Sequence, residues 1–131
     1  ALGLAQLEKI NQYLKKKELI YLNYKKFIGQ NNKLFFKEIP KFASSNHWLN
    51  LVEFIDCNTK KKLLKKIEVF KKNKIEVRPI WQLNHLQKVY KNCEKYKISN
   101  ATILVNRTLC LPSSVSLTTK DIKRVVAIIN E

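Results

Sequence analysis

Glycine is scarce in this 131-residue sequence, and its scarcity argues against one class of ligand site. Only Gly3 and Gly29 are glycine. No glycine-rich loop is therefore present that could wrap backbone N–H groups around a phosphate. We do not expect a self-contained nucleotide-binding domain.

Long apolar runs are also missing. The sequence has no stretch of about 18 or more apolar residues, and no basic segment followed by an apolar one that would resemble a secretion signal. With 45% hydrophobic residues, 131 residues can still form one compact domain with its own core, and they are few for two. We expect a single domain, residues 1–131, in the cytoplasm and without a membrane partner.

Cysteine is limited to Cys57, Cys93 and Cys110. Their number is odd, they are widely separated, and none of the short paired spacings of zinc sites occurs. We interpret them as reduced thiols, mostly buried, and expect no metal site.

Acidic residues are few, 10 against 26 basic ones, which gives a formal net charge of +16. Such a charge suggests an anionic partner, for example nucleic acid. However, 23 of the basic residues are lysine and only three are arginine, whereas nucleic-acid surfaces depend on arginine for bidentate and stacking contacts. We interpret the charge as a solvated basic surface. A stand-alone basic module that binds nucleic acid or another partner stays the alternative.

Apolar residues at three- and four-residue spacing run from residue 2 to residue 28 and predict one long N-terminal helix. No capping residue precedes it, so we expect the helix to begin upstream of this sequence. Gly29 is expected to end it. Leu2, Leu4 and Leu7 are too apolar for a free helix start, which predicts self-association or disordered first turns in the isolated chain.

The rest of the chain alternates between short strands and helices. Strands are predicted where aromatic and branched residues cluster or precede a proline, and helices where apolar residues recur at helical spacing. Thr118 with Asp121 forms a capping pattern that predicts the start of the last helix. The expected strands are 34–39, 47–55, 75–78 and 108–111; the expected helices are 61–73, 99–106 and one ending near 129, with one or two helical turns near 85–90.

These elements predict an α/β or α+β fold, in which helices pack on a small sheet of short strands of mixed direction. The stretch from 79 to 97 is largely irregular.

Three regions carry recognisable motifs. Residues 1–10 are ALGLAQLEKI, residues 44–56 are SSNHWLNLVEFID, and residues 75–90 with 109–129 contain Arg-Pro-x-Trp-x-x-x-His and Leu-Pro-Ser. In this order they resemble the helix after the active-site half, the small-domain strand, and the substrate loop with the terminal helix of the DegT/DnrJ/EryC1/StrS sugar aminotransferases. Within that family the sequence is most similar to the branch that makes 4-amino-4,6-dideoxy sugars for bacillosamine, legionaminic acid and related surface glycans.

The resemblance implies the C-terminal small domain of a fold-type-I aminotransferase. Such enzymes are usually homodimers that transfer an amino group from glutamate, through pyridoxal phosphate, to C4 of a nucleotide-linked 4-keto-6-deoxy sugar. The groups that hold the cofactor, including a lysine that binds it covalently, belong to the large domain. None of the 23 lysines here falls in a matching motif. The resemblance therefore implies no catalytic residue and no bound cofactor in this chain, and it implies two missing partners, the large cofactor-binding domain and a second subunit.

Arg78, Trp81 and His85 match the loop that approaches the sugar nucleotide, so the resemblance implies that they bind substrate. Their chemistry suits this role: a fixed cation for phosphate or carboxylate, a flat apolar face for a sugar or base, and an imidazole donor and acceptor. Alternatives stay open. Arg78 could pair with Glu76 or Glu53 on the surface, Trp81 could anchor the core or a domain interface, and His85 could be structural. If the three serve one site, they should be partly exposed, face a common opening and lack partners within the chain.

Overall fold

The structure, a computed structural model, describes residues 1–29 and 31–130. Nine helices and strands of standard type occur in this part. They are α1 (Leu2–Glu8), α2 (Ile10–Ile28), β1 (Leu34–Phe36), β2 (Asn50–Phe54), α3 (Lys60–Lys72), β3 (Arg78–Pro79), α4 (Ser99–Arg107), β4 (Thr108–Leu111) and α5 (Thr119–Ile129). Two single-turn 3-10 helices, η1 (Asn84–Leu86) and η2 (Lys88–Tyr90), follow β3, as expected from the sequence.

The N-terminal helix extends as far as the sequence predicts, but the prediction of one continuous helix is wrong. Lys9 leaves the helical region with φ of −105° and ψ of 1°, and its N–H donates to the Gln6 carbonyl in a tightened last turn. The physical reason is that α1 buries none of its residues, so no packing holds it in line with α2. At the other end Gly29 has φ of 61°, a conformation that favours glycine, and it stops α2 as predicted.

The strands form a four-stranded sheet in the order β1-β2-β4-β3. Every strand pair of the described residues is antiparallel, so the expected mixed directions are wrong. β3 lies at the edge of the sheet, where Pro79 can be accommodated although it has no N–H to donate. β2 begins only at Asn50, because His47 has a positive φ of 49° that is incompatible with an extended strand.

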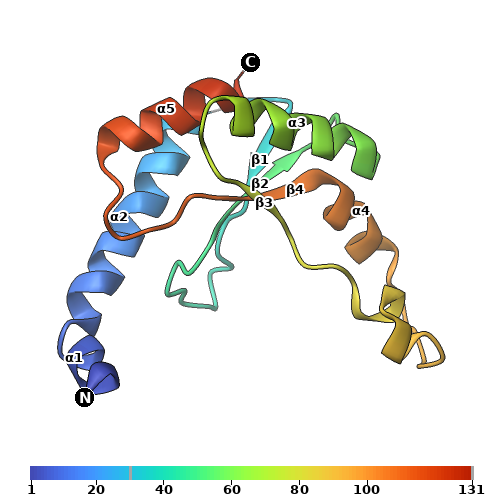
Figure 1. Cartoon of the computed structure of the whole chain (residues 1–131), viewed down its shortest axis with the longest axis horizontal. Coiled ribbons are helices and arrows are strands. Elements are labelled where there is room, and N and C mark those ends of the chain that lie inside the picture. Colours follow the sequence, from blue (N-terminus) through green and yellow to red (C-terminus); the bar gives the residue numbers. More distant parts are fainter. Residues whose placement is uncertain (30, 131) are drawn as a thin grey trace.

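One face of the sheet carries the core. Asn50, Val52 and Phe54 alternate along β2 toward the buried side, while α3 and α5 lie together above the sheet (Figure 1). α2 packs against α5. The core side chains come from all these elements, among them Tyr24, Leu63, Phe70, Leu109 and Ile122. The fold is therefore an antiparallel sheet covered by helices on one side, as the sequence predicts for an α+β domain.

The molecule has the outline of an arch (Figure 1). α1 and the first part of α2 extend downward on one side, and the segment with η1 and η2 extends downward on the other. The loop between β1 and β2 hangs between them, beneath the sheet and opposite α3 and α5. None of the helices in the described part has the length and apolarity needed to cross a bilayer.

The cysteines lie largely as expected. Cys57 and Cys110 are buried free thiols and Cys93 is exposed. Burial raises the pKa of the Cys57 and Cys110 thiols, which keeps them protonated and unreactive near neutral pH.

Candidate functional site

The segment that follows β3 brings two of the three predicted site residues together. Trp81 and His85 line the same cavity, which has a volume of about 460 Å³ and also receives Gln82, Asn84 and Tyr90. The indole of Trp81 is 63% exposed. The ring of His85, carried by η1, is half-buried and forms no hydrogen bond with another described residue. Trp81 therefore does not serve as a core anchor.

A second tryptophan joins this site from another part of the chain. Trp48, just before β2, also has 63% of its surface exposed, and its ring centroid lies 5.6 Å from that of Trp81 with the planes tilted by 38°. These are the only two tryptophans in the sequence. Sequence reasoning missed Trp48, because its pairing with Trp81 bridges 33 positions that no local pattern connects.

Lys17 fixes the backbone at Trp48. Its ammonium donates to the Trp48 carbonyl (3.2 Å) and to the Ser113 carbonyl, and it lies 3.4 Å from the Ser113 hydroxyl. Asn50 donates to the same hydroxyl (2.9 Å). Burial lowers the pKa of Lys17. α2, the start of β2 and the chain after β4 thus meet at one charged hydrogen-bonded junction next to the tryptophan pair.

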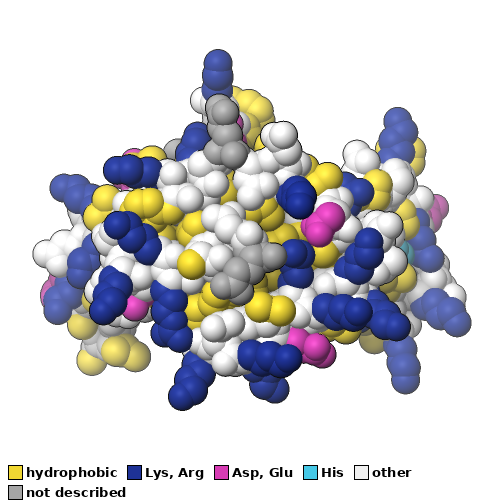
Figure 2. Space-filling model, turned by 90° about the horizontal axis from the view of Figure 1, so that it is seen from above, with side chains coloured by type: hydrophobic (Ala, Val, Ile, Leu, Met, Phe, Trp, Pro, Cys, Tyr) yellow, Lys and Arg dark blue, Asp and Glu magenta, His cyan; other side chains and the backbone are white. Residues whose placement is uncertain are grey.

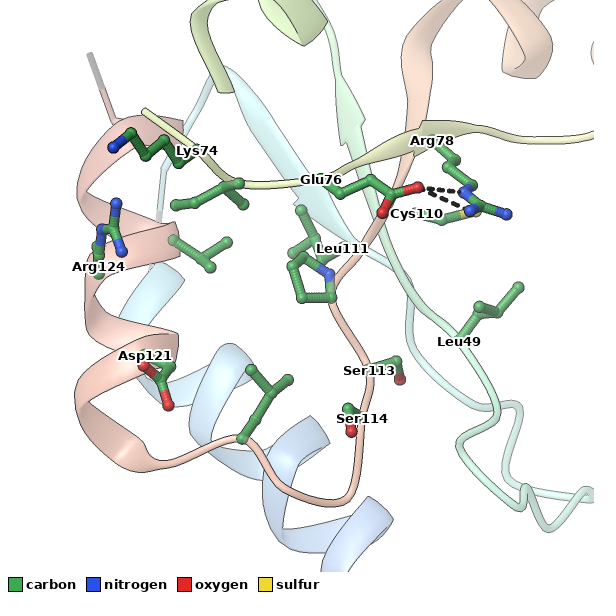
Figure 3. A pocket seen from close by; sticks show the side chains of 14 residues that line it. Leu49, Lys74, Glu76, Arg78, Cys110, Leu111, Ser113, Ser114, Asp121 and Arg124 are labelled. Atoms are coloured by element: carbon green, nitrogen blue, oxygen red, sulfur yellow. Dashed lines mark hydrogen bonds and ion pairs between the residues drawn. The ribbon is translucent and has the colours of Figure 1, made fainter. Parts of the chain in front are cut away.

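Arg78 lies elsewhere. It lines a different cavity, of about 500 Å³, between α5 and the chain around β3 (Figure 3). Its guanidinium donates twice to the Glu76 carboxylate, at 2.7 and 2.9 Å, and both side chains are largely exposed. Glu53, the second carboxylate that the sequence offers to Arg78, pairs instead with Lys37 and Arg107.

The expectation that Arg78 shares an opening with Trp81 and His85 and lacks a partner is therefore wrong. The reason is local. Glu76 and Arg78 are two positions apart on nearly extended backbone, so both side chains point to the same side and can pair at once.

The polar groups around the larger cavity are mostly engaged in holding the fold. Asp121 accepts from the Thr118 hydroxyl (2.6 Å) and the Thr118 N–H (2.9 Å), and these hydrogen bonds lower the pKa of its carboxyl. Arg124 donates to the Asn73 carbonyl (2.6 Å). Figure 3 shows the Glu76–Arg78 pair beside Cys110 and apart from Arg124 and Lys74. We regard this cavity as a groove of the fold and the tryptophan-lined cavity as the candidate site.

The chemistry of the candidate site is that of binding. The cavity offers the Trp81 indole, which Trp48 contacts, together with amide groups and an imidazole, and these groups suit a flat or partly apolar ligand with polar edges. Within the described residues, no group of three or more metal-ligating side chains is close enough together to hold a metal ion.

Comparisons with known proteins agree on one family. The model of the DegT/DnrJ/EryC1/StrS aminotransferase family matches residues 1–130. EpsN of Bacillus subtilis (strain 168), named as a pyridoxal phosphate-dependent aminotransferase, is 26% identical over 133 residues, which cover 97% of this chain and 33% of EpsN.

Solved structures show the same fold at lower identity. DesI, determined with its TDP-sugar product, superimposes with a TM-score of 0.84 at 21% identity. The match covers 97% of this chain and 33% of DesI. Helicobacter pylori PseC, an aminotransferase involved in pseudoaminic acid biosynthesis, gives 0.81 at 19% identity over 98% of this chain and 35% of PseC. The chain spans about one third of the length of these relatives. Its fold matches the corresponding third of a fold-type-I aminotransferase.

Proposed function

The chain belongs to the DegT/DnrJ/EryC1/StrS aminotransferase family, and from this premise we propose that it is the C-terminal small domain of a pyridoxal-phosphate-dependent sugar aminotransferase. In this proposal the complete enzyme is a homodimer that aminates C4 of a nucleotide-linked 4-keto-6-deoxy sugar, with glutamate as donor, for surface-glycan synthesis. The sugar-related names of DesI and PseC support a sugar substrate.

The described residues do not fit pyridoxal phosphate by themselves. A lysine that binds the cofactor needs a free amine in a pocket that also anchors the phosphate. Burial lowers the pKa of Lys17, but its ammonium is already engaged by the Trp48 and Ser113 carbonyls. Cofactor binding and catalysis therefore belong, in this proposal, to the two thirds of the relatives that this chain does not cover.

The observation that carries the proposal is the open cavity with Trp81 and His85. The indole is exposed, and the imidazole has no hydrogen bond with another described residue although it lines a cavity. Groups of this kind are available to a ligand that the rest of the enzyme would help to hold. Arg78 stays a proposed substrate contact, which requires that it exchange Glu76 for a phosphate or carboxylate of the substrate.

A chimera tests this function. The third of EpsN that the chain matches is replaced by residues 1–131, and glutamate-dependent amination of a series of nucleotide-linked 4-keto-6-deoxy sugars is measured together with the cofactor absorbance. We expect activity, and we expect His85→Ala to reduce kcat/KM about tenfold or more with the cofactor spectrum unchanged, because a hydrogen bond to the substrate is lost.

Lys88→Ala is the matched control, since Lys88 is an exposed residue of the same segment. It should retain parental activity. A chimera that binds cofactor but aminates none of the sugars would contradict the proposed reaction, and unchanged kinetics for His85→Ala would remove His85 from the substrate site.

A further inference from the structure

Trp48 and Trp81 contact each other on the surface, where the exposure of two large apolar rings to water is unfavourable. Trp48 and Trp81 each leave 63% of their area in water, although indole is among the side chains that gain most from burial. Neither ring is needed in the core, which is complete without them. We propose that Trp48 and Trp81 together form a stacking platform for the base of the nucleotide ligand, an assignment that rests on the proposed function for the identity of that ligand as a sugar nucleotide.

The backbone on both sides of the platform is held in place. Trp48 is fixed through its carbonyl by Lys17 (3.2 Å) and is followed at once by β2. Trp81 comes two residues after Pro79, which is paired with Leu109 in the sheet. A platform anchored at both ends loses little conformational entropy when a ligand stacks on it, which favours binding.

The geometry favours a planar heterocycle. The ring centroids are 5.6 Å apart and the planes are tilted by 38°, so the rings contact each other and cannot enclose a ligand between them. Each ring instead keeps an exposed indole surface beside the other ring, and bases of any identity stack on exposed aromatic rings.

Polar groups for the edge of a base are next to the platform. Gln82 and Asn84 line the same cavity as Trp81, and their amides provide both donors and acceptors. The Asn84 side-chain oxygen accepts from the Gln87 amide (3.3 Å), and its own amide nitrogen has no hydrogen-bond acceptor among the described residues. Indole rings next to amide groups match a nucleobase better than a sugar phosphate, because a sugar phosphate has no flat aromatic face that could stack.

Tryptophan fluorescence reads this site directly, because the chain has no tryptophan outside the pair. The 131-residue chain is titrated with UMP and, separately, with ribose 5-phosphate, which has the same phosphate and ribose but no base. Excitation is at the red edge of the tryptophan band, where the nucleotide does not absorb. We expect saturable quenching by UMP and none by ribose 5-phosphate at equal concentration.

Substitutions assign the quenching to the pair. Trp48→Leu and Trp81→Leu each leave one fluorophore and should weaken UMP binding about tenfold or more, the usual loss when a base loses a stacking partner. Phe42→Leu removes an aromatic ring that is 93% exposed in the same loop as Trp48, and it should bind UMP like the parent. Circular dichroism of each variant confirms that the fold is retained.

Each other result would overturn the platform. Equal quenching by ribose 5-phosphate would mean that lysines bind the phosphate. Absence of quenching by UMP would mean that the chain offers no site for a base. Parental affinity of Trp48→Leu for UMP would exclude Trp48 from the site. The chimera activity is an independent readout. An active chimera without UMP binding refutes the platform alone, and UMP binding with an inactive chimera refutes the proposed reaction alone.

Discussion

Tyr24 shows how a single residue joins distant parts of this fold. Its side chain is fully buried, and its hydroxyl donates to the Pro112 carbonyl at 3.0 Å. Burial, with a smaller contribution from the charge of Asp121, raises the pKa of the phenol, so the hydroxyl stays a donor at all physiological pH values. One hydrogen bond thereby ties α2 to the chain that leaves β4, next to the Lys17 junction.

Tyr24→Phe should lower the free energy of unfolding by about 1 kcal/mol, because the ring remains packed while the Pro112 carbonyl loses its buried partner. Urea denaturation followed by circular dichroism measures the loss. Tyr96→Phe is the control, since Tyr96 is 80% exposed, and it should change stability by less than about 0.5 kcal/mol. Equal stability of Tyr24→Phe and the parent would show that the hydrogen bond is replaced by water.

At the residue scale the sequence predicts one opening for Arg78, Trp81 and His85, but only Trp81 and His85 share a cavity. Trp81 and His85 are four positions apart and line the same cavity, with His85 on the short helix η1. Arg78 belongs to the same motif, but it pairs with Glu76, which lies two positions earlier, just before β3. Trp48 could not be found at all, since only the assembled sheet brings it to Trp81.

Among the elements, α5 is the one whose start is encoded most locally. Thr118 accepts from the Asp121 N–H (3.2 Å), and Asp121 accepts from the Thr118 N–H in return, which forms a complete capping box. The sequence predicted this start, because the two residues and the apolar stripe that follows lie within one short segment. The break at Lys9 and the antiparallel order of the strands depend on packing between distant segments, so no local pattern revealed them.

Thr118→Ala should therefore destabilise the chain by about 1 kcal/mol at neutral pH, the usual cost of losing an N-cap side chain. The effect of Asp121→Asn should depend on pH. Hydrogen bonds from Thr118 lower the carboxyl pKa in the folded state, so the stabilisation is present above the unfolded pKa, about 3.9, and disappears as the pH falls through the lower folded value.

Thermal unfolding of the parent and Asp121→Asn from neutral to acidic pH checks this sign. The two stability curves should be separate at neutral pH and converge at the acidic end. Glu68→Gln serves as the control, because Glu68 is an exposed carboxylate on α3 that forms no side-chain hydrogen bond or ion pair with another described residue. A gap between the curves that widens on acidification would contradict the assignment.

At the scale of the whole molecule, two surfaces differ in character. Lysine and arginine side chains are scattered over the helix-covered face in Figure 2, without forming a single stripe. The interpretation of the charge as a solvated surface, with nucleic acid not a partner, stays a prediction. The other surface is apolar: α1 buries nothing, and Leu2, Leu4 and Leu7 are 78%, 65% and 65% exposed.

This apolar surface on α1 predicts that the isolated chain self-associates, since a leucine side chain gains about 1.5–3 kcal/mol when it is fully buried. In the complete enzyme we expect the large domain or the second subunit to cover it. Light scattering after size-exclusion chromatography should show a molar mass that rises with protein concentration. The double substitution Leu4→Glu with Leu7→Glu should return the chain to a monomer at the same concentrations.

The added negative charge needs its own control, because it also reduces the repulsion between strongly basic chains. Leu64→Glu with Ile103→Glu changes the net charge by the same amount at two exposed positions of α3 and α4. If burial of α1 drives association, this control still self-associates while the α1 variant does not. If both double variants dissociate alike, or if the parent is a monomer at every concentration, α1 is not the contact surface and its leucines are compatible with water.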